Sequence, residues 1–146
     1  MPLSDFAKWL LWISSFGQAP DARARTRARH ILSSRKRLGK AEWYEQHWRH
    51  RGVPQELSDF VYEHFPYYSQ IDFGSVAPSD RLVKDLDWFR LCWNDWEFDL
   101  YDEFRKHFGV RIEKSFELET DTTVEQMVLQ LAKCFHGRGA TARPDK

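Results

Sequence analysis

The sequence predicts an all-α protein. Along most of the chain, apolar residues recur at intervals of three and four, the spacing that gathers them on one face of a helix. No stretch sustains the alternation of apolar and polar residues typical of strands, and no Asn-Gly or Asp-Gly pair marks a hairpin turn. The 146 residues are 42% apolar and 16% aromatic. This composition suits one globular core and argues against the collagen-like, mucin-like and transmembrane classes.

The first two expected helices lie in a basic N-terminal segment. Residues 3–16 carry an amphipathic pattern, and the Gly17–Pro20 segment ends it. The apolar run at 9–16 is far shorter than the roughly 20 residues that span a membrane, and no basic region precedes it as in a signal peptide. A second helix is expected over 21–37, because it is rich in alanine and arginine and Asp21 is a suitable N-cap.

Two further helices are expected in the middle of the chain. A third helix should cover 41–50, before the Gly52–Pro54 segment interrupts it. The fourth should begin just after Pro54, because proline is tolerated in the first turn of a helix. A second proline, Pro66, is expected to end this helix.

The clearest helix is expected between Trp96 and Phe108. Its large apolar residues lie at successive i+4 positions. Asn94 or Asp95 should cap its first turn, and Gly109 should end it.

The last helix opens with a capping-box pattern at residues 122–125 and continues to Phe135. A single helical turn is expected at 116–119. Residues 137–146 are small and polar, and we expect them to form a disordered tail.

Charge cancels over the whole chain but not along it. There are 22 Lys and Arg against 22 Asp and Glu. Residues 1–51 hold 11 basic against 4 acidic residues, a net charge of +7, and residues 52–146 hold 11 against 18, a net charge of −7. We therefore expect a basic helical extension over 1–51, joined to an acidic helical domain over 52–136. The zero net charge would argue against an electrostatic partner, whereas this distribution favours one.

The extension carries a candidate basic patch, and three interpretations of it stay open. It can fold onto the acidic domain, bind an anionic membrane surface together with the rest of residues 3–37, or bind nucleic acid, in that order of preference. Trp43 and Trp48 could then stack on bases or lie at a lipid interface. The patch consists of Arg23, Arg25, Arg27, Arg29, Arg35, Lys36 and Arg37.

Three short patterns between residues 53 and 135 occur in a characteristic order. They are the pair Asp85 and Leu86, the apolar stripe of Leu100, Phe104 and Phe108, and the pair Thr123 and Val124. In this order they resemble an acyl carrier protein, which has an Asp-Leu pair before its second helix, a buried stripe on that helix and a Thr-Val pair that opens its fourth helix. The resemblance implies an acyl-carrier-like four-helix bundle, preceded here by the basic extension.

This chain departs from the family at the attachment site. Acyl carriers bear phosphopantetheine on a serine at the start of the second helix, and the corresponding position here is Asn94. No serine lies between Asp80 and Lys114. An amide side chain cannot accept the prosthetic arm, so we expect no cofactor and no acyl carriage. Cys92 lies nearby in an aromatic run, where a cysteine is more often a small apolar residue than a nucleophile.

The resemblance also implies a partner surface. Acyl carriers are recognised through the acidic face of their second helix, and here three carboxylates and one aromatic ring lie opposite the buried stripe. An aromatic ring among carboxylates is typical of a docking anchor, although Phe98 could instead pack on the N-terminal helices. The expected function is a non-enzymatic interaction module that presents this face to a basic protein partner or to its own extension. The residues of this face are Asp95, Phe98, Asp99 and Asp102.

The sequence contains no catalytic or metal-binding pattern. It lacks a nucleophile–base spacing, a glycine-rich phosphate loop and paired metal ligands. The histidines His47, His50 and His64 come without the cysteine pair that many zinc sites use. The only cysteines are Cys92 and Cys134, as is common for reduced cytosolic thiols. We expect a bacterial cytoplasmic protein without catalytic residues or metal, peripheral at the inner membrane face if the extension binds lipid.

Overall fold

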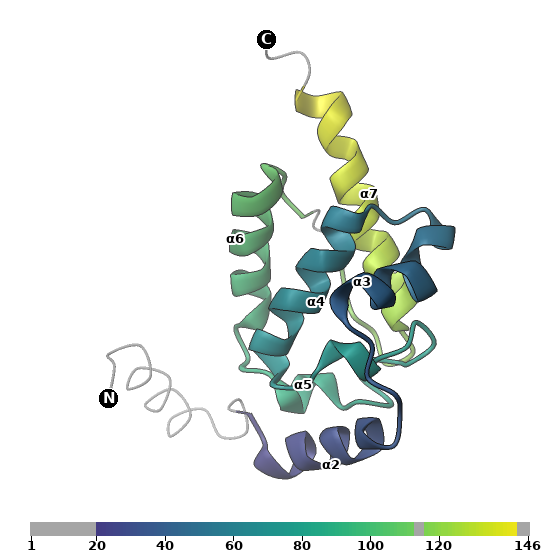
Figure 1. Ribbon diagram of the computed structural model, residues 1–146. Coiled ribbons are helices and arrows are strands. Elements are labelled where there is room, and N and C mark those ends of the chain that lie inside the picture. The colour runs from purple at the N-terminus through teal and green to yellow at the C-terminus, as the bar shows by residue number, and fades with distance from the viewer. Residues whose placement is uncertain (1–19, 113–115, 143–146) are drawn as a thin grey trace.

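A computed structural model describes residues 20–112 and 116–142, with the backbone alone described for 138–142. This part of the chain is helical and contains no strand, so the all-α class is confirmed (Figure 1). Its one β-type pairing is an isolated antiparallel bridge between Arg81 and Thr123. In order, the helices are α2 (Ala22–Ser33), α3 (Lys40–Trp43), the π-helix η1 (Tyr44–Trp48), the 3₁₀-helix η2 (Arg49–Arg51), α4 (Gln55–Ser69), the 3₁₀-helix η3 (Phe73–Ser75), α5 (Trp88–Leu91), α6 (Trp96–Phe108) and α7 (Val124–Ala142).

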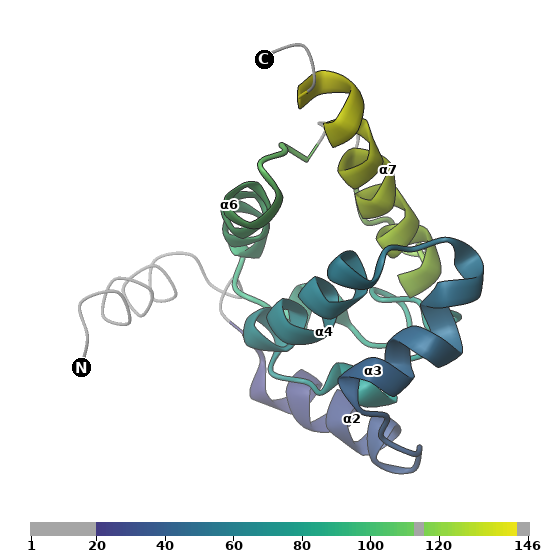
Figure 2. The same ribbon diagram turned by 45° about the horizontal axis from the view of Figure 1, so that its top comes forward.

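One aromatic-rich core joins these helices. Helix α4 lies between α6 and α7, and α2 lies across the base of the molecule beside α5 (Figures 1 and 2). Phe60 of α4 meets Phe104 of α6 with ring centroids 5.6 Å apart, and Phe108 of α6 meets Phe135 of α7 at 5.1 Å. The buried residues run from Ala24 to Phe135, so the core includes side chains from both the basic and the acidic segment.

Helix α2 is shorter than the predicted 21–37. The Asp21 side chain caps it by accepting hydrogen bonds from the backbone N–H groups of Arg23 and Ala24, at 2.8 and 3.3 Å. The helix ends at Ser33. Beyond it the backbone N–H of Leu38 donates to the carbonyl of Gly74 at 2.9 Å, so tertiary contacts draw residues 36–39 out of the helix. The approach is close, because a Cβ on Gly74 would lie 2.4 Å from the carbonyl oxygen of Leu38.

The third predicted helix, over 41–50, forms, but its hydrogen-bonding pattern changes along its length. It runs from Lys40 to Arg51 and passes from α to π to 3₁₀ geometry. The π-turn places residues five apart nearly one above the other. Trp43 and Trp48 therefore share a face, with ring centroids 5.5 Å apart, and both are fully buried.

The prediction that Pro66 ends α4 is wrong. The helix passes through Pro66 and ends at Ser69, where Gln70 adopts a left-handed conformation with φ 64°. Proline removes one helical hydrogen bond, but the last turn gains contacts that offset the loss. Tyr68 of that turn packs on Trp96, with ring centroids 6.2 Å apart. Phe65, just before that turn, packs on Trp88, with ring centroids 5.8 Å apart.

Helix α6 has the bounds that the sequence predicted. It ends where Gly109 adopts φ 70° and donates its N–H to the carbonyl of Arg105 at 2.8 Å. Asp95 is the N-cap residue, but its side chain makes no capping hydrogen bond.

The start of α7 differs by one residue from the predicted capping box. The reciprocal hydrogen bonds join Thr123 and Gln126, at 3.0 and 3.1 Å. Thr122 is engaged elsewhere, because its hydroxyl accepts from the Glu119 N–H and its carbonyl accepts from the Leu82 N–H.

Two predictions on either side of this cap also differ from the structure. Residues 116–119 are not helical, so the single turn predicted there is wrong. Helix α7 continues to Ala142, within the segment 137–146 predicted to be a disordered tail.

Candidate functional site

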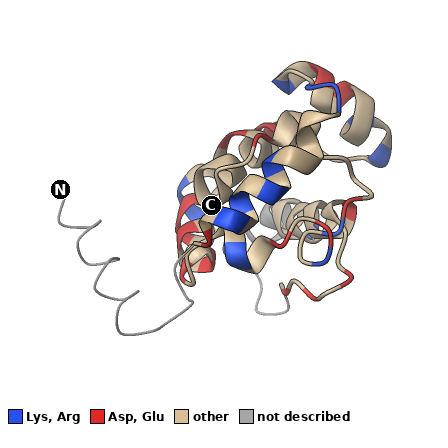
Figure 3. Ribbon diagram, turned by 90° about the horizontal axis from the view of Figure 1, so that it is seen from below, with Lys and Arg blue, Asp and Glu red and all other residues tan. Residues whose placement is uncertain are grey.

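Most side chains of the predicted basic patch bond to other residues of the same molecule. Five of its seven side chains bond to residues 70–91, which belong to the acidic segment and lie beside α2 and the non-helical linker that follows it. In Figure 3, Lys and Arg mark α2 as the basic helix on this underside of the molecule. The five bonds are Arg25 to the Leu91 carbonyl, Arg27 to Asp87, Arg29 to the Gln70 carbonyl, Arg35 to Asp80 and Arg37 to Asp72; Arg23 and Lys36 are exposed.

The bond between Arg35 and Asp80 is the most buried of the ion pairs among these contacts. The guanidinium forms two hydrogen bonds to the carboxylate, at 2.7 and 3.0 Å, and the Asp80 side chain is only 8% exposed. The Ala77 N–H also donates to this carboxylate, at 2.7 Å. The Asp80 hydrogen bonds raise the pKa of Arg35. This pair therefore fastens the linker after α2 to the start of the 80–87 segment.

Helix α6 places the predicted partner face on the surface. Phe98 is 72% exposed and Asp99 is exposed, while Asp95 and Asp102 are half-buried. The described part of the basic segment does not cover Phe98. Asp102 pairs with Arg105 at 3.0 Å and with Lys106 at 3.1 Å. The Lys106 hydrogen bond, followed by that of Arg105, lowers the pKa of Asp102.

The two halves of α6 therefore differ in charge. Its first turn is acidic, with Glu97 and Asp99, and its last turn is basic, with Arg105, Lys106 and His107. This order stabilises the helix, because carboxylates favour the positive N-terminal end of the helix dipole and cations the negative C-terminal end. The sequence prediction of an acidic face thus applies to the N-terminal half alone.

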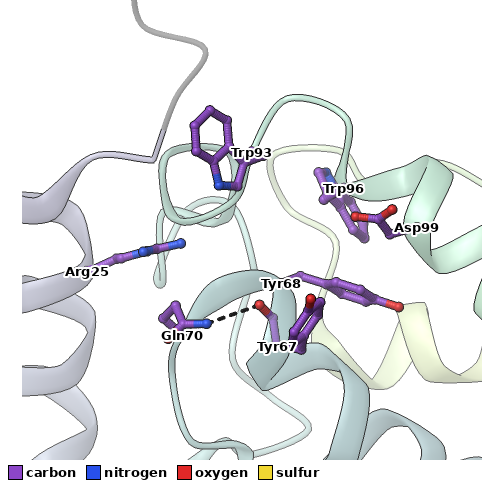
Figure 4. A pocket seen from close by; sticks show the side chains of 7 residues that line it. All are labelled: Arg25, Tyr67, Tyr68, Gln70, Trp93, Trp96 and Asp99. Carbon is purple, nitrogen blue, oxygen red and sulfur yellow. Dashed lines mark hydrogen bonds between the residues drawn. The ribbon is translucent and has the colours of Figure 1, made fainter. Parts of the chain in front are cut away.

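A pocket of about 230 Å³ adjoins this acidic half (Figure 4). It lies between α2, the end of α4 and the start of α6. Arg25 enters from the α2 side, while Trp96 and Asp99 come from the α6 side. Four of its seven lining residues are aromatic. The lining residues are Arg25, Tyr67, Tyr68, Gln70, Trp93, Trp96 and Asp99.

Two polar side chains in the pocket wall, Arg25 and Tyr68, differ in their hydrogen bonding and in the direction of their pKa shift. The Arg25 Nε–H donates to the Leu91 carbonyl at 2.9 Å, and partial burial lowers the pKa of Arg25. The Tyr68 hydroxyl is buried without a hydrogen-bond partner among the described residues. Burial raises the pKa of Tyr68, and the negative charges of Glu103 and Asp99 raise it further. Tyr68 therefore stays a neutral phenol, and nothing in the pocket is arranged as a nucleophile.

The structure also places the residues around the position that matches a carrier's attachment serine. Asn94 is exposed in the turn before α6. Cys92 is buried, and this burial raises the pKa of its thiol despite the opposing charge of Arg25. A protonated buried thiol is a poor nucleophile, so Cys92 packs as a small apolar residue. Cys134 is also buried and free.

Trp43 and Trp48 are not available for the roles predicted for them. Both are fully buried, and the Trp43 Nε1–H donates to the Val76 carbonyl at 2.9 Å. They therefore cannot stack on bases or lie in a lipid interface. The predicted membrane anchor covers residues 3–37, and its first part, residues 3–19, lies outside the described residues. Among the described helices, none is long and apolar enough to cross a bilayer.

The pocket itself was not predicted from the sequence. Its residues come from three helices and two turns, and two of them were among the predicted site residues, Arg25 of the basic patch and Asp99 of the partner face. The available signal was the pairing of aromatic residues at positions 67–68 and at 93 and 96. That signal is ambiguous, because similar aromatic residues fill the core.

Comparisons of the chain with protein-family models, curated proteins and solved structures gave no match. The geometry of the site therefore carries the functional argument.

Proposed function

We propose that this protein is a non-enzymatic interaction module whose docking surface is the exposed N-terminal half of α6. We define this docking surface as Asp95, Phe98, Asp99 and the adjoining aromatic pocket. Its partner is a protein with a basic contact surface.

The exposure of Phe98 carries this proposal. A phenylalanine that is 72% exposed in the first turn of a regular helix leaves a large apolar area in water. Burying such an area against a partner is favourable, and aromatic residues near the centre of a contact often dominate its binding energy. The opposite face of α6 is anchored by four buried residues, Trp96, Leu100, Phe104 and Phe108. The ring is therefore presented by a rigid support.

The charges around Phe98 favour a basic partner. Asp95 and Asp99 flank it along the helix, and Asp99 also borders the pocket. A lysine or arginine side chain of the partner could lie between the aromatic walls with its charge beside Asp99, where cation–π attraction adds to the ion pair. Arg25 on the α2 side of the pocket repels a second cation. The pocket is thus suited to one basic side chain in one orientation.

The carrier-like interpretation is a further part of the proposal. Helices α4, α6 and α7 would correspond to the first, second and fourth helices of an acyl carrier protein, with Asn94 in place of the prosthetic serine. The buried stripe of α6 and the Thr123 cap of α7 support this correspondence. The non-helical residues 116–119 lie where the family has its short third helix, so the likeness depends mainly on α6 and α7.

Site-specific photo-crosslinking tests the docking surface. A photoreactive phenylalanine analogue is placed at position 98 or at position 89, and the tagged protein is irradiated in cells. Phe89 is the matched control, because it is 53% exposed but belongs to α5. We expect a discrete crosslinked protein from position 98 and not from position 89.

The captured protein is then purified and titrated with variants. We expect Phe98→Ala to weaken binding by about thirtyfold, the scale of a hot-spot residue, and Phe89→Ala to leave it unchanged. Asp99→Lys should weaken binding and reduce its salt dependence, whereas Glu56→Lys, an exposed acidic position on α4, should do neither. Equal affinities for the wild type, Phe98→Ala and Asp99→Lys would refute the docking surface.

A further inference from the structure

A second group of chemically active side chains lies between α4 and α6, and none of its three residues lines the aromatic pocket. His64 comes from α4, and Glu103 and His107 come from α6. One ligand-type atom from each of the three lies within 4.8 Å of the others. Glu103 and His107 are one helical turn apart and so share a face of α6. His64 Nε2 lies 4.0 Å from Glu103 Oε1.

The hydrogen bonding of His64 directs a lone pair into this group. Its Nδ1 lies 3.1 Å from the Phe60 carbonyl oxygen. A carbonyl can only accept a hydrogen bond, so the network assigns the proton to Nδ1. In the neutral ring, Nε2 then carries the free lone pair and faces Glu103. A histidine that binds a metal commonly donates its other ring N–H to a carbonyl or carboxylate in this way.

Phe60 supports both imidazoles from the inside. It is buried and stacks on His64, with centroids 4.1 Å apart and an interplanar angle of 17°. It also contacts the edge of the His107 ring at 5.3 Å. The centroids of the two imidazole rings lie 4.9 Å apart, and the angle between the ring planes is 85°. The inner wall of the group is therefore apolar, and its open side faces solvent.

We propose that His64, Glu103 and His107 form a divalent metal site, with Zn²⁺ as the preferred ion. Two imidazole nitrogens and one carboxylate oxygen are ligands that zinc prefers, and three protein ligands leave one position for water. Zinc bonds of 2.0–2.2 Å require ligand atoms about 3.3 Å apart in a tetrahedron. The ligand atoms lie within 4.8 Å of one another, so the side chains must close by up to about 1.5 Å. Exposed His107 and half-exposed Glu103 can rotate to do so.

This grouping explains why the sequence suggested no metal site. The ligands belong to helices that are far apart along the chain, and of the three histidines considered from the sequence only His64 is among them. His47 is partly buried, which lowers its pKa, and His50 Nε2 lies 3.0 Å from an Arg51 nitrogen. In the described part of the chain, the group that forms around His64 contains Glu103 and His107 instead. The site does not depend on the proposed docking surface.

The test is a zinc titration of untagged protein that has been stripped with a chelator. Isothermal titration calorimetry should give one Zn²⁺ per chain, and zinc should raise the thermal unfolding temperature, because the ion joins α4 to α6. The visible absorption of a Co²⁺ complex should show tetrahedral coordination with nitrogen and oxygen ligands. Circular dichroism of the metal-free variants checks that each has folded.

Three variants assign the ligands. We expect His107→Ala and Glu103→Gln each to reduce zinc affinity by about tenfold or more, a loss that outer-shell changes alone produce in known sites. His30→Ala removes an exposed histidine from α2 and should leave affinity unchanged. Absence of stoichiometric binding, or wild-type affinity in both His107→Ala and Glu103→Gln, would overturn the proposal. Loss of binding in His30→Ala would do so as well, by placing the ion elsewhere.

Discussion

Helices α2 and α6 are both highly charged, and they use their charge in opposite ways. The arginines of α2 extend to a neighbouring segment, where Arg25, Arg27 and Arg29 bond to carbonyl or carboxylate oxygens between residues 70 and 91. On α6, by contrast, Asp102 pairs with Arg105 and Lys106 of the same helix. Side-chain length explains much of the difference. Arginine reaches across a helix interface, whereas aspartate stays beside its own backbone.

The apolar faces of the two helices differ as well. Helix α2 buries only Ala24, Ala28 and Leu32. Helix α6 buries two phenylalanines, a leucine and a tryptophan. Since apolar area is the main source of favourable free energy on packing, α2 depends on polar contacts and α6 does not. The outer face of α6 consequently keeps Phe98 exposed to solvent, whereas much of the basic surface of α2 is engaged within the molecule.

The largest effect is expected from the buried face of α6. Phe104→Ala should lower the free energy of unfolding by about 3–5 kcal/mol, because it removes a fully buried ring and leaves a cavity. Phe98→Ala, on the same helix, should change it by no more than about 0.5 kcal/mol. Urea unfolding of both variants measures the contrast. Similar losses for the two would mean that Phe98 contributes to the fold.

A smaller effect is expected where the basic segment joins the rest. Arg35→Ala should cost about 2–3 kcal/mol of unfolding free energy, because Asp80 is left nearly buried without its cation. Arg27→Ala removes an exposed pair with Asp87, and we expect a loss of about 0–1 kcal/mol. Chemical denaturation at neutral pH compares them. An unchanged free energy of unfolding in Arg35→Ala would show that the ion pair does not hold this linker in place.

The smallest effect is expected at the cap of α2 and depends on pH. The N–H groups of Arg23 and Ala24 lower the pKa of Asp21. Because its folded-state pKa is below its unfolded value of about 4, the cap stabilises the protein fully above that pH and loses this contribution as the pH falls through the folded pKa. The wild type should therefore exceed Asp21→Ala in stability at pH 7, and the difference should shrink in acid. A constant difference would contradict the carboxylate cap.

Predictions from local sequence succeeded where the deciding contacts are local. The bounds of α6 follow from its own apolar spacing and from Gly109, which adopts the left-handed conformation that glycine tolerates. Predictions failed where distant contacts decide. Helix α4 continues past Pro66 because its last turn packs on tryptophans far along the chain, and the cap of α7 moves to Thr123 because Thr122 bonds to Leu82 and Glu119.

The same distinction holds for the candidate sites. The exposure of Phe98 could be predicted, because its position opposite the buried stripe of α6 depends on helical periodicity alone. The aromatic pocket and the group around His64 could not, because each combines residues from separate helices.

By itself, the sequence determined that the chain is helical, which face of α6 is buried, and that basic and acidic residues are segregated. These are consequences of residue type and spacing. Only the tertiary structure decided which charges are paired within the molecule and which remain on its surface, that Trp43 and Trp48 are in the core, and that His64 meets Glu103 and His107. The reason is physical: such contacts depend on how helices pack, and the packing brings together residues whose separation along the chain carries no signal.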